Sequence, residues 1–381
     1  MFDSSSIETA IELSENDPFA EQGVIQQTGE RMDSRIIWSV FMKIVKFFIL
    51  LVVVNVAVFP CFGNELKRVV VLETMTLPIV QQFTDVFLSK FQEMGYTEGK
   101  NSELIRMNAQ GDPKRAEKLL SDALDEKKPD LVVAVATLAS KAAQTVLKVH
   151  NIPLLFMSVT DPVGAGLIDS VGEPTGTNIT GKAHYVSADI KIELTLRIIG
   201  KIAPHRPIRF GYIYSTYPSA ISDLRRLEAS AKKRKDIEFV PYEIPYHPIP
   251  QYTDLLLEKV LTGMQALEGK MDFLWAPRGA LGVSPEYSQI LIEKASVPLI
   301  VGATEESVKQ GALFHVTGDP VSQAEDAAIM AKSILEGTPP GAIVPSLPNR
   351  IQVAVNLSTA LKMKLAVPSD ILELAKDRIY H

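Results

Sequence analysis

Small hydroxyl residues recur in this sequence at the places where predicted strands give way to helices. Thr74 and Thr76 follow one predicted strand, Thr137 follows another, and Ser158 and Thr160 follow a third. At such turns, backbone N–H groups at the start of a helix stabilise an anionic group, for example a carboxylate. Ser and Thr also cap helices in any α/β protein. The recurrence is therefore consistent both with the binding of a carboxylate and with ordinary helix capping.

Comparable turns occur in the second half of the chain. Ser215–Ser219, with the sequence Ser-Thr-Tyr-Pro-Ser, follows one predicted strand, and Pro277-Arg278-Gly279 follows another. A guanidinium can bind a carboxylate through two parallel hydrogen bonds. Arg278 could act in this way, or it could simply lie in solvent, and the residues around it favour neither interpretation.

The stretch from Ile152 to Gly181 combines a buried strand with polar residues at its end. Leu154–Met157 is an apolar run, and hydroxyl and carboxylate side chains follow it as far as Asp161. In an open α/β sheet, ligands bind in the crevice outside the carboxyl ends of the strands. The Gly-, Pro- and Asn-rich residues Pro174–Gly181 indicate a crossing between domains. The alternative is a strand followed by a long surface loop, and both interpretations are open.

Other kinds of chemistry lack their usual sequence patterns. The six histidines are scattered without metal-ligand spacing, and no Walker loop, nucleophile elbow or zinc-protease helix occurs. Gly164-Ala165-Gly166 begins like a dinucleotide-binding motif, but Asp169 stands in place of the third glycine. We therefore expect no catalytic residue, no cofactor and no metal site. The formal net charge of −6 argues against nucleic acid as a partner.

The chain alternates between strands that are buried on both faces and amphipathic helices, which is typical of parallel α/β sheets with right-handed crossovers. Predicted strands lie at residues 69–72, 103–107, 131–135, 154–157, 208–214, 237–240, 273–275, 297–301, 312–316 and 351–355. Predicted helices lie at residues 78–94, 113–126, 137–149, 188–202, 219–233, 252–267, 286–295, 320–335, 358–365 and 369–378. The 381 residues thus predict two similar doubly wound halves, with a C-terminal segment that crosses back between them.

The N-terminal region predicts two further segments. Residues 1–32 are polar and acidic, and we expect residues 1–41 to be a disordered extension or, if translation starts at Met42, not to be part of the protein. Residues 42–63 place Lys43 and Lys46 before a long apolar run, with small residues at Cys61 and Gly63, which is the layout of a cleavable signal peptide. An uncleaved membrane anchor and a lipidated Cys61 are the alternatives. Cys61 is the single cysteine, so the folded body has none, which suits an exported protein.

The chain resembles the substrate-binding proteins of ABC importers, specifically the tryptophan/tyrosine-type branch. The resemblance covers most of the chain from Arg68 to Ile379. The segments that carry it are Gly95–Asn101 (GYTEGKN), Gly111-Asp112-Pro113, Ser158–Leu167 (SVTDPVGAGL), Asn178–Gly181 (NITG), Val355–Ala360 and Val367–Ser369. The chain differs from the family at Pro277-Arg278-Gly279, where relatives more often have an acidic or amide residue, and at Ser215-Thr216-Tyr217, where an Asn-Pro pair is common.

The resemblance implies the fold class α/β, with two doubly wound parallel-sheet lobes joined by a multi-strand hinge, the type I periplasmic-binding fold. By analogy, lobe 1 comprises residues 64–183 and 319–345, and lobe 2 comprises residues 184–318 and 346–381. The ligand would lie between the lobes. Characterised relatives bind aromatic amino acids, but the two departures face the cleft, so the ligand is not carried over.

The resulting hypothesis is a non-enzymatic, periplasmic and monomeric solute receptor, which closes on a small polar, amino-acid-like ligand and delivers it to an ABC permease in the inner membrane. The predicted ligand-binding residues are Thr76, Thr137, Ser158 and Asp161 in lobe 1, and Ser215, Tyr217, Arg278 and Asp319 in or next to lobe 2. Hydroxyl groups and helix N-termini would hold a carboxylate, Asp161 or Asp319 an ammonium, and Tyr217 an apolar or aromatic portion. Closure would occur through hinge segments near Gly181, Gly318 and Pro345.

Two alternative functions are consistent with the same sequence. A membrane-anchored ligand sensor would keep the predicted segment around residues 36–62 as an anchor and signal through a partner. A hydrolase would use Asp161 and Asp319 as an acid–base pair. No sequence feature specifically supports the enzyme.

Overall fold

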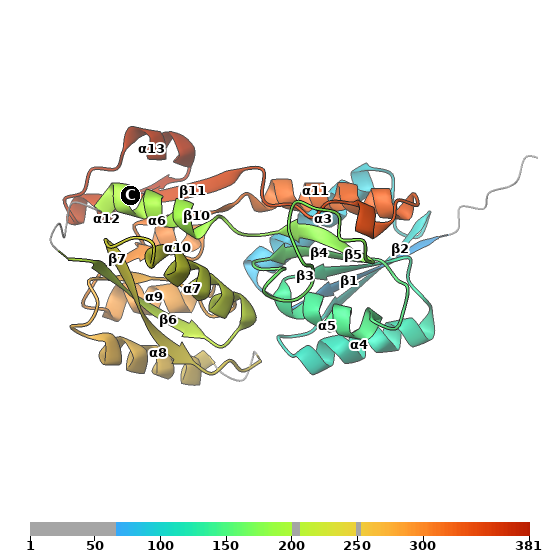
Figure 1. Cartoon of the computed structure of the whole chain (residues 1–381), viewed down its shortest axis with the longest axis horizontal. Coiled ribbons are helices and arrows are strands. Elements are labelled where there is room, and N and C mark those ends of the chain that lie inside the picture. Colours follow the sequence, from blue (N-terminus) through green and yellow to red (C-terminus); the bar gives the residue numbers. More distant parts are fainter. Residues whose placement is uncertain (1–65, 200–205, 249–252) are drawn as a thin grey trace, which may run out of the picture. The chain divides into compact units, whose positions relative to one another are not determined.

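Two β-sheets, each flanked by helices, form the fold (Figure 1). The computed structural model describes residues 66–199, 206–248 and 253–381. The sheet of lobe 1 has the strand order β2-β1-β3-β4-β5, and the sheet of lobe 2 has the order β12-β11-β10-β9-β8-β6-β7. Two separate sheets, instead of one continuous sheet, leave room for a ligand site between the lobes.

The sheet of lobe 1 is parallel throughout and is covered on both faces. Its strands are β1 (Lys67–Glu73), β2 (Ser102–Asn108), β3 (Leu131–Val135), β4 (Leu154–Val159) and β5 (Ile179–Ala183). Its helices are α3 (Pro78–Glu93), α4 (Pro113–Glu126), α5 (Thr137–Leu147), α11 (Pro320–Leu335) and the 3₁₀ helix η1 (Pro340–Ala342). Along β1, Val70 and Leu72 pack with α4 and α5, while Val69 and Val71 pack with α3 and α11.

The sheet of lobe 2 is parallel except between β10 and β11. Its strands are β6 (Ile208–Ser215), β7 (Ile237–Ile244), β8 (Phe273–Trp275), β9 (Leu299–Val301), β10 (Phe314–Gly318), β11 (Ile351–Asn356) and β12 (Ile379–Tyr380). Its helices are α6 (Ala188–Ile199), α7 (Pro218–Ala231), α8 (Thr253–Leu267), α9 (Pro285–Lys294), α10 (Glu305–Gln310), α12 (Leu357–Lys362) and α13 (Ser369–Ala375). The antiparallel pair departs from the all-parallel prediction, because β11 enters the sheet from lobe 1.

Three segments cross between the lobes, after β5, after β10 and before β11 (Figure 1). The interpretation of Pro174–Gly181 as a crossing is wrong, because Ile179–Ala183 forms the fifth strand of lobe 1 and pairs with β4. A Cβ atom on Gly181 would lie 2.0 Å from the carbonyl oxygen of Phe156. Glycine therefore permits the close approach of the two strands, and the crossing follows Ala183.

The first crossing is held by a buried lysine. Lys182, on β5, is 2% exposed and forms an ion pair of 2.8 Å with Asp326 on α11. Its Nζ also donates to the hydroxyl of Ser346 at 2.8 Å. The lysine thus ties the end of β5 to the segment that leads into β11, so two of the crossings are fixed to each other.

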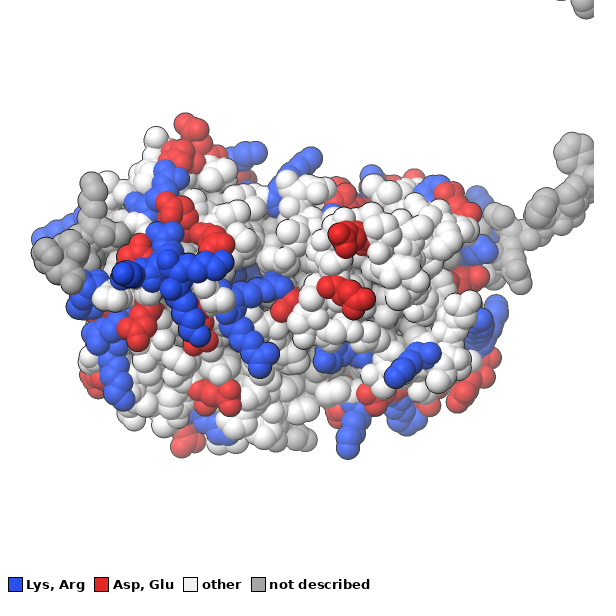
Figure 2. All heavy atoms as spheres, in the orientation of Figure 1, with Lys and Arg blue, Asp and Glu red and all other residues white. Residues whose placement is uncertain are grey.

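The predicted disordered extension at 1–41 and the predicted signal or anchor at 42–63 lie outside the described residues. Within the described part of the chain, no helix is both long and apolar enough to cross a membrane. Figure 2 shows one face of the molecule, on which Lys and Arg side chains lie among Asp and Glu side chains.

Candidate functional site

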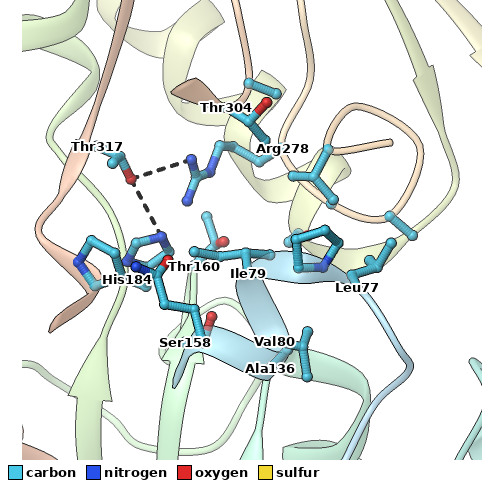
Figure 3. Close-up of a pocket in the computed structure, with 18 of the residues that line it drawn as sticks. Leu77, Ile79, Val80, Ala136, Ser158, Thr160, His184, Arg278, Thr304 and Thr317 are labelled. Carbon is cyan, nitrogen blue, oxygen red and sulfur yellow. Dashed lines mark hydrogen bonds between the residues drawn. The ribbon is translucent and has the colours of Figure 1, made fainter. Parts of the chain in front are cut away.

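A cavity of about 480 Å³ is lined by residues of both lobes (Figure 3). Lobe 1 contributes the carboxyl ends of β1, β3 and β4 and the first turn of α3. Lobe 2 contributes the loop between β8 and α9, the start of α10, and β10, while His184 comes from the first crossing. The volume suits a small molecule the size of an amino acid or somewhat larger.

The wall from lobe 1 contains two residues with unusual backbone conformations. Ala136, after β3, has a φ of 71°, and Ser158, near the end of β4, has a φ of 59°. The N–H of Ala136 donates to the carbonyl oxygen of Met157 at 2.9 Å, which keeps the two strand ends together. Positive φ is costly for residues other than glycine and is concentrated at functional sites. The same wall is apolar where Leu77, Ile79 and Val80 face the cavity.

The wall from lobe 2 presents Arg278, which extends into the cavity from the loop after β8 (Figure 3). Its Nη1 donates to the hydroxyl of Thr317 at 3.4 Å. The next residue, Gly279, has a φ of +98°, and a Cβ atom there would lie 2.8 Å from the hydroxyl oxygen of Ser219. Glycine therefore allows the loop to turn tightly against the start of α7. Burial lowers the pKa of Arg278, but a guanidinium stays protonated in proteins.

Two buried histidines line the same cavity. His184 contacts Gln323 of α11 through Nδ1 at 3.3 Å and Thr317 of β10 through Nε2 at 3.3 Å, so it bridges the lobes. His315 donates from Nδ1 to the carbonyl oxygen of Gly302 at 2.8 Å. Burial and the charge of Arg278 lower the pKa of both rings, to about 3 for His315. Both rings are therefore neutral at pH 7.

The start of α5 is covered by an aromatic side chain from lobe 2. Tyr217 is 3% exposed and belongs to a core cluster of lobe 1. Burial raises the pKa of Tyr217 to about 12, while hydrogen bonds with the Thr74 side chain and the backbone of Leu138 oppose the rise. The hydroxyl of Thr74 also accepts from the N–H of Ala139 at 3.0 Å. Protein groups therefore already occupy the helix N-terminus that was expected to hold a carboxylate.

Tyr246 is a second aromatic residue of lobe 2 that contacts lobe 1. Its ring packs edge-on against the ring of Tyr217, with the centroids 5.0 Å apart. Its hydroxyl donates to the carbonyl oxygen of Gly111 in lobe 1 at 2.9 Å. The two tyrosines fill the seam beside the cavity.

The structure brings together four of the eight predicted ligand-binding residues, because Thr137, Ser158, Tyr217 and Arg278 line the cavity. Thr76 and Ser215 line a neighbouring pocket of about 360 Å³. Arg278 is partly buried in the cavity, unlike a solvated surface arginine.

Asp161 and Asp319 are not among the residues that line the cavity. The carboxylate of Asp161 accepts from the N–H of Gly164 at 2.9 Å and forms an ion pair with Arg226 of α7. The carboxylate of Asp319 accepts from the N–H of Val321 at 3.1 Å and caps α11. An acid–base pair formed by these two residues therefore has no support in the geometry.

Sequence reasoning missed several lining residues, among them His184, Thr304, His315 and Thr317. Thr317 precedes a crossing and lies near the end of β10, and this position was the signal that could have identified it. No group of three or more His, Cys, Asp or Glu side chains able to hold a metal ion occurs in the described ranges 66–199, 206–248 and 253–381.

Comparison with known proteins agrees with this architecture. Residues 68–379 match the model of the family described as ABC transporter substrate binding protein. The chain belongs to this family. Its members are extracytoplasmic or membrane-anchored proteins that bind small molecules and work with ABC permeases, and the family is a non-enzymatic one.

Individual relatives match most of the chain. A protein of Clostridioides difficile named tyrosine-binding protein is 28% identical over 320 residues, which is 83% of this chain and 86% of the relative. A crystal structure of a conserved domain protein from Vibrio cholerae has a TM-score of 0.69 at 25% identity and covers 83% of this chain and all of that one. A Streptococcus pneumoniae domain in complex with L-Trp has a TM-score of 0.68 at 20% identity, with the same coverage.

Proposed function

We propose that this chain is the periplasmic solute-binding component of an ABC importer and holds one small, amino-acid-like ligand between its lobes. The observation that carries the proposal is the cavity lined by both lobes, with Arg278 on one wall and apolar side chains on the other. The protein acts as a monomer, and an ABC permease in the inner membrane receives the ligand. The aromatic amino acids named for the C. difficile and S. pneumoniae proteins support a ligand of this size.

The interlobe contacts support a closing motion. Arg226 of lobe 2 binds the carbonyl oxygen of Thr160 at 3.0 Å and the carboxylate of Asp161, both in lobe 1. The side chain of Thr160 lines the cavity. A ligand that contacts both walls therefore favours the same arrangement of the lobes as this ion pair. The crossings after Ala183 and Gly318 and around Pro345 would act as the hinge.

Thermal unfolding of the purified protein tests the proposal. We would screen amino acids, aromatic and aliphatic carboxylates, and sugars at millimolar concentration. A ligand at a hundred times its Kd adds about 2.7 kcal/mol to the free energy of unfolding, which raises the melting temperature by several degrees. No shift with any compound, for a sample that unfolds cooperatively, would contradict the proposal.

A pair of variants locates the binding. Val283 lines the cavity and is partly buried, so Val283→Trp should place an indole ring in the cavity, obstruct the ligand and reduce or abolish the ligand-induced shift. Val149 is 84% exposed, so Val149→Trp should leave the shift unchanged. Equal shifts in the two variants would place the ligand elsewhere.

A further inference from the structure

Arg278 is a cation without a carboxylate partner. Among the described residues, no carboxylate lies within ion-pair distance of its guanidinium; the buried carboxylate of Asp223 acts on it electrostatically without a direct contact, and its hydrogen bond to Thr317 is long, at 3.4 Å. A partly buried guanidinium with five donors needs acceptors, and leaving it unpaired in a site of low dielectric is costly. An anion from outside the protein would satisfy it.

The other charges at the cavity are already balanced. Glu306 forms an ion pair of 3.3 Å with Lys309. Glu305 forms an ion pair of 3.3 Å with Arg378 and accepts a hydrogen bond from the hydroxyl of Tyr380. These groups therefore neither cancel the charge of Arg278 nor offer an unpaired carboxylate to a ligand.

The charges behind the cavity wall are balanced as well. Lys191 and Asp223 form a buried ion pair of 2.6 Å. The hydroxyl of Tyr212 donates to the second carboxylate oxygen of Asp223 at 3.0 Å. The pair is neutral as a unit; the Asp223 carboxylate also acts electrostatically on Arg278, but it makes no direct contact with the guanidinium, which is left free to bind a ligand anion.

An ammonium group would find no unpaired carboxylate in this cavity, because Glu305 and Glu306, which line it, already form ion pairs. Asp161 is held by Arg226 and Gly164, and Asp319 caps α11, so neither expected carboxylate faces the ligand. The remaining polar groups on the walls include hydroxyls and neutral imidazoles, for example Ser158, Thr160 and His315. Placing an ammonium near the unpaired Arg278 adds like-charge repulsion to the loss of hydration.

The rest of the lining suits an apolar body. Leu77, Ile79 and Val80 face the cavity from lobe 1, and Ala280 and Val283 from lobe 2. A cavity of about 480 Å³ accommodates an aromatic ring with a short chain. The site thus combines one unpaired guanidinium with apolar surfaces, beside hydroxyls and neutral imidazoles.

We propose that the ligand is an organic monoanion without an ammonium group, namely a carboxylate with an aromatic or apolar body, and that its carboxylate pairs with Arg278. This inference rests on the proposed receptor function and assigns to it a ligand that has the carboxylate of an amino acid but not the ammonium. Arylpropionates and aryl-2-oxo acids have this chemistry, whereas the corresponding amino acids carry the additional positive charge.

Matched ligand series separate the two classes. One series is 3-(4-hydroxyphenyl)propionate, L-tyrosine and tyramine, and the other is indole-3-propionate, L-tryptophan and tryptamine. Isothermal titration calorimetry of the purified protein should give the propionate at least about tenfold tighter binding than the amino acid, because the amino acid brings an unpaired buried charge. The amines should not bind.

A matched pair of variants tests the role of Arg278. Arg278→Gln removes the charge and should weaken propionate binding about a hundredfold, since a desolvated charge pair is lost. Arg225 is an exposed arginine on α7 that does not line the cavity, so Arg225→Gln should bind as the wild type does. Thermal unfolding without ligand shows that both variants fold.

The results that would contradict this proposal can be told apart from one another. If an amino acid binds as tightly as its propionate or more tightly, the anion assignment is overturned and the receptor function stands. If the propionate binds equally well to wild type and Arg278→Gln, the pairing with Arg278 is overturned. If nothing in these series or in the broader screen binds, both the inference and the receptor function fail.

Discussion

Arg226 and Arg278 are both arginines of lobe 2 at the seam with lobe 1, but they have different partners. Arg226 forms an ion pair with Asp161 across the seam, and its guanidinium lies 4.0 Å from the centre of the Tyr185 ring. Arg278 makes its hydrogen bond to Thr317, within its own lobe. The first arginine is satisfied by the protein, and the second faces a cavity.

The two arginines therefore have different roles at the interface between the lobes. An arginine with a partner in the opposite lobe stabilises the contact between the lobes whether or not a ligand is present. An arginine without such a partner leaves a charge for the ligand to neutralise. Because Thr160 contacts Arg226 through its carbonyl oxygen and lines the cavity, the two sites lie next to each other.

The largest expected effect comes from breaking the paired site. Asp161→Ala should lower the free energy of unfolding by about 3 kcal/mol, because it leaves Arg226 without its partner at a site of limited exposure. It also removes the acceptor for the N–H of Gly164. Chemical denaturation measures the change. Asp169 is an exposed residue of the same loop, so Asp169→Ala should cost less than about 0.5 kcal/mol. Similar losses in both variants would contradict the assigned role.

The charge of Arg278 should instead affect how the free energy of unfolding depends on pH, because it acts on the neighbouring His315. The pKa of His315 is lowered to about 3 by burial first, then by Arg278, with Lys191 adding to the shift and the hydrogen bond to Gly302 opposing it. Below the ordinary pKa of about 6.5, the unfolded chain therefore binds a proton on His315 that the folded protein does not. Stability should fall by about 2 kcal/mol for this group between pH 7 and pH 5.

Variants of single histidines identify the source of this loss. His315→Asn should reduce the acid sensitivity, while His150→Asn, at an exposed position, should not. In Arg278→Met the pKa of His315 should rise toward its ordinary value, so less stability is lost in acid. Denaturant titrations at pH 7 and pH 5 measure each difference. An unchanged pH dependence in His315→Asn would show that other groups cause it.

A smaller effect is expected when the arginine of the paired site is removed. Arg226→Met leaves Asp161 bonded to the N–H of Gly164 and keeps an apolar chain beside Tyr185. The side chain of Arg226 is 29% exposed, so the loss in the free energy of unfolding should be about 1 kcal/mol. Ligand affinity should also fall slightly, as measured by calorimetry. A loss as large as that of Asp161→Ala would mean that Arg226 also contributes by packing.

Much of the fold follows from local sequence patterns, because strands such as Val69–Leu72 and Leu131–Val135 are apolar on both faces. The pattern fails where a buried strand carries polar residues. β5 has the sequence Ile-Thr-Gly-Lys-Ala, and its Lys182 is buried because Asp326 and Ser346, far along the chain, satisfy its charge. The direction of β11 likewise depends on the path of the crossing segments, which no local pattern specifies.

The candidate site, like the fold, could be predicted from the sequence only in part. The rule that ligands bind beyond strand ends led to Thr137, Ser158 and Arg278, which line the cavity. The rule could not say which charges the protein pairs internally. Asp161 looked like a free carboxylate in the sequence, and only the packing of α7 against lobe 1 shows that Arg226 takes it.

The smallest effect is expected for Arg278→Met without ligand. The substitution removes a long hydrogen bond to Thr317 and an unpaired, partly desolvated charge, and these two changes oppose each other. The free energy of unfolding should therefore stay within about 0.5 kcal/mol of the wild type, whereas the stabilisation by a carboxylate ligand should disappear. Denaturation with and without ligand measures both quantities, and Arg226→Met should show the reverse pattern. A loss of 2 kcal/mol or more in the ligand-free Arg278→Met protein would mean that this arginine, like Arg226, has its partner within the protein.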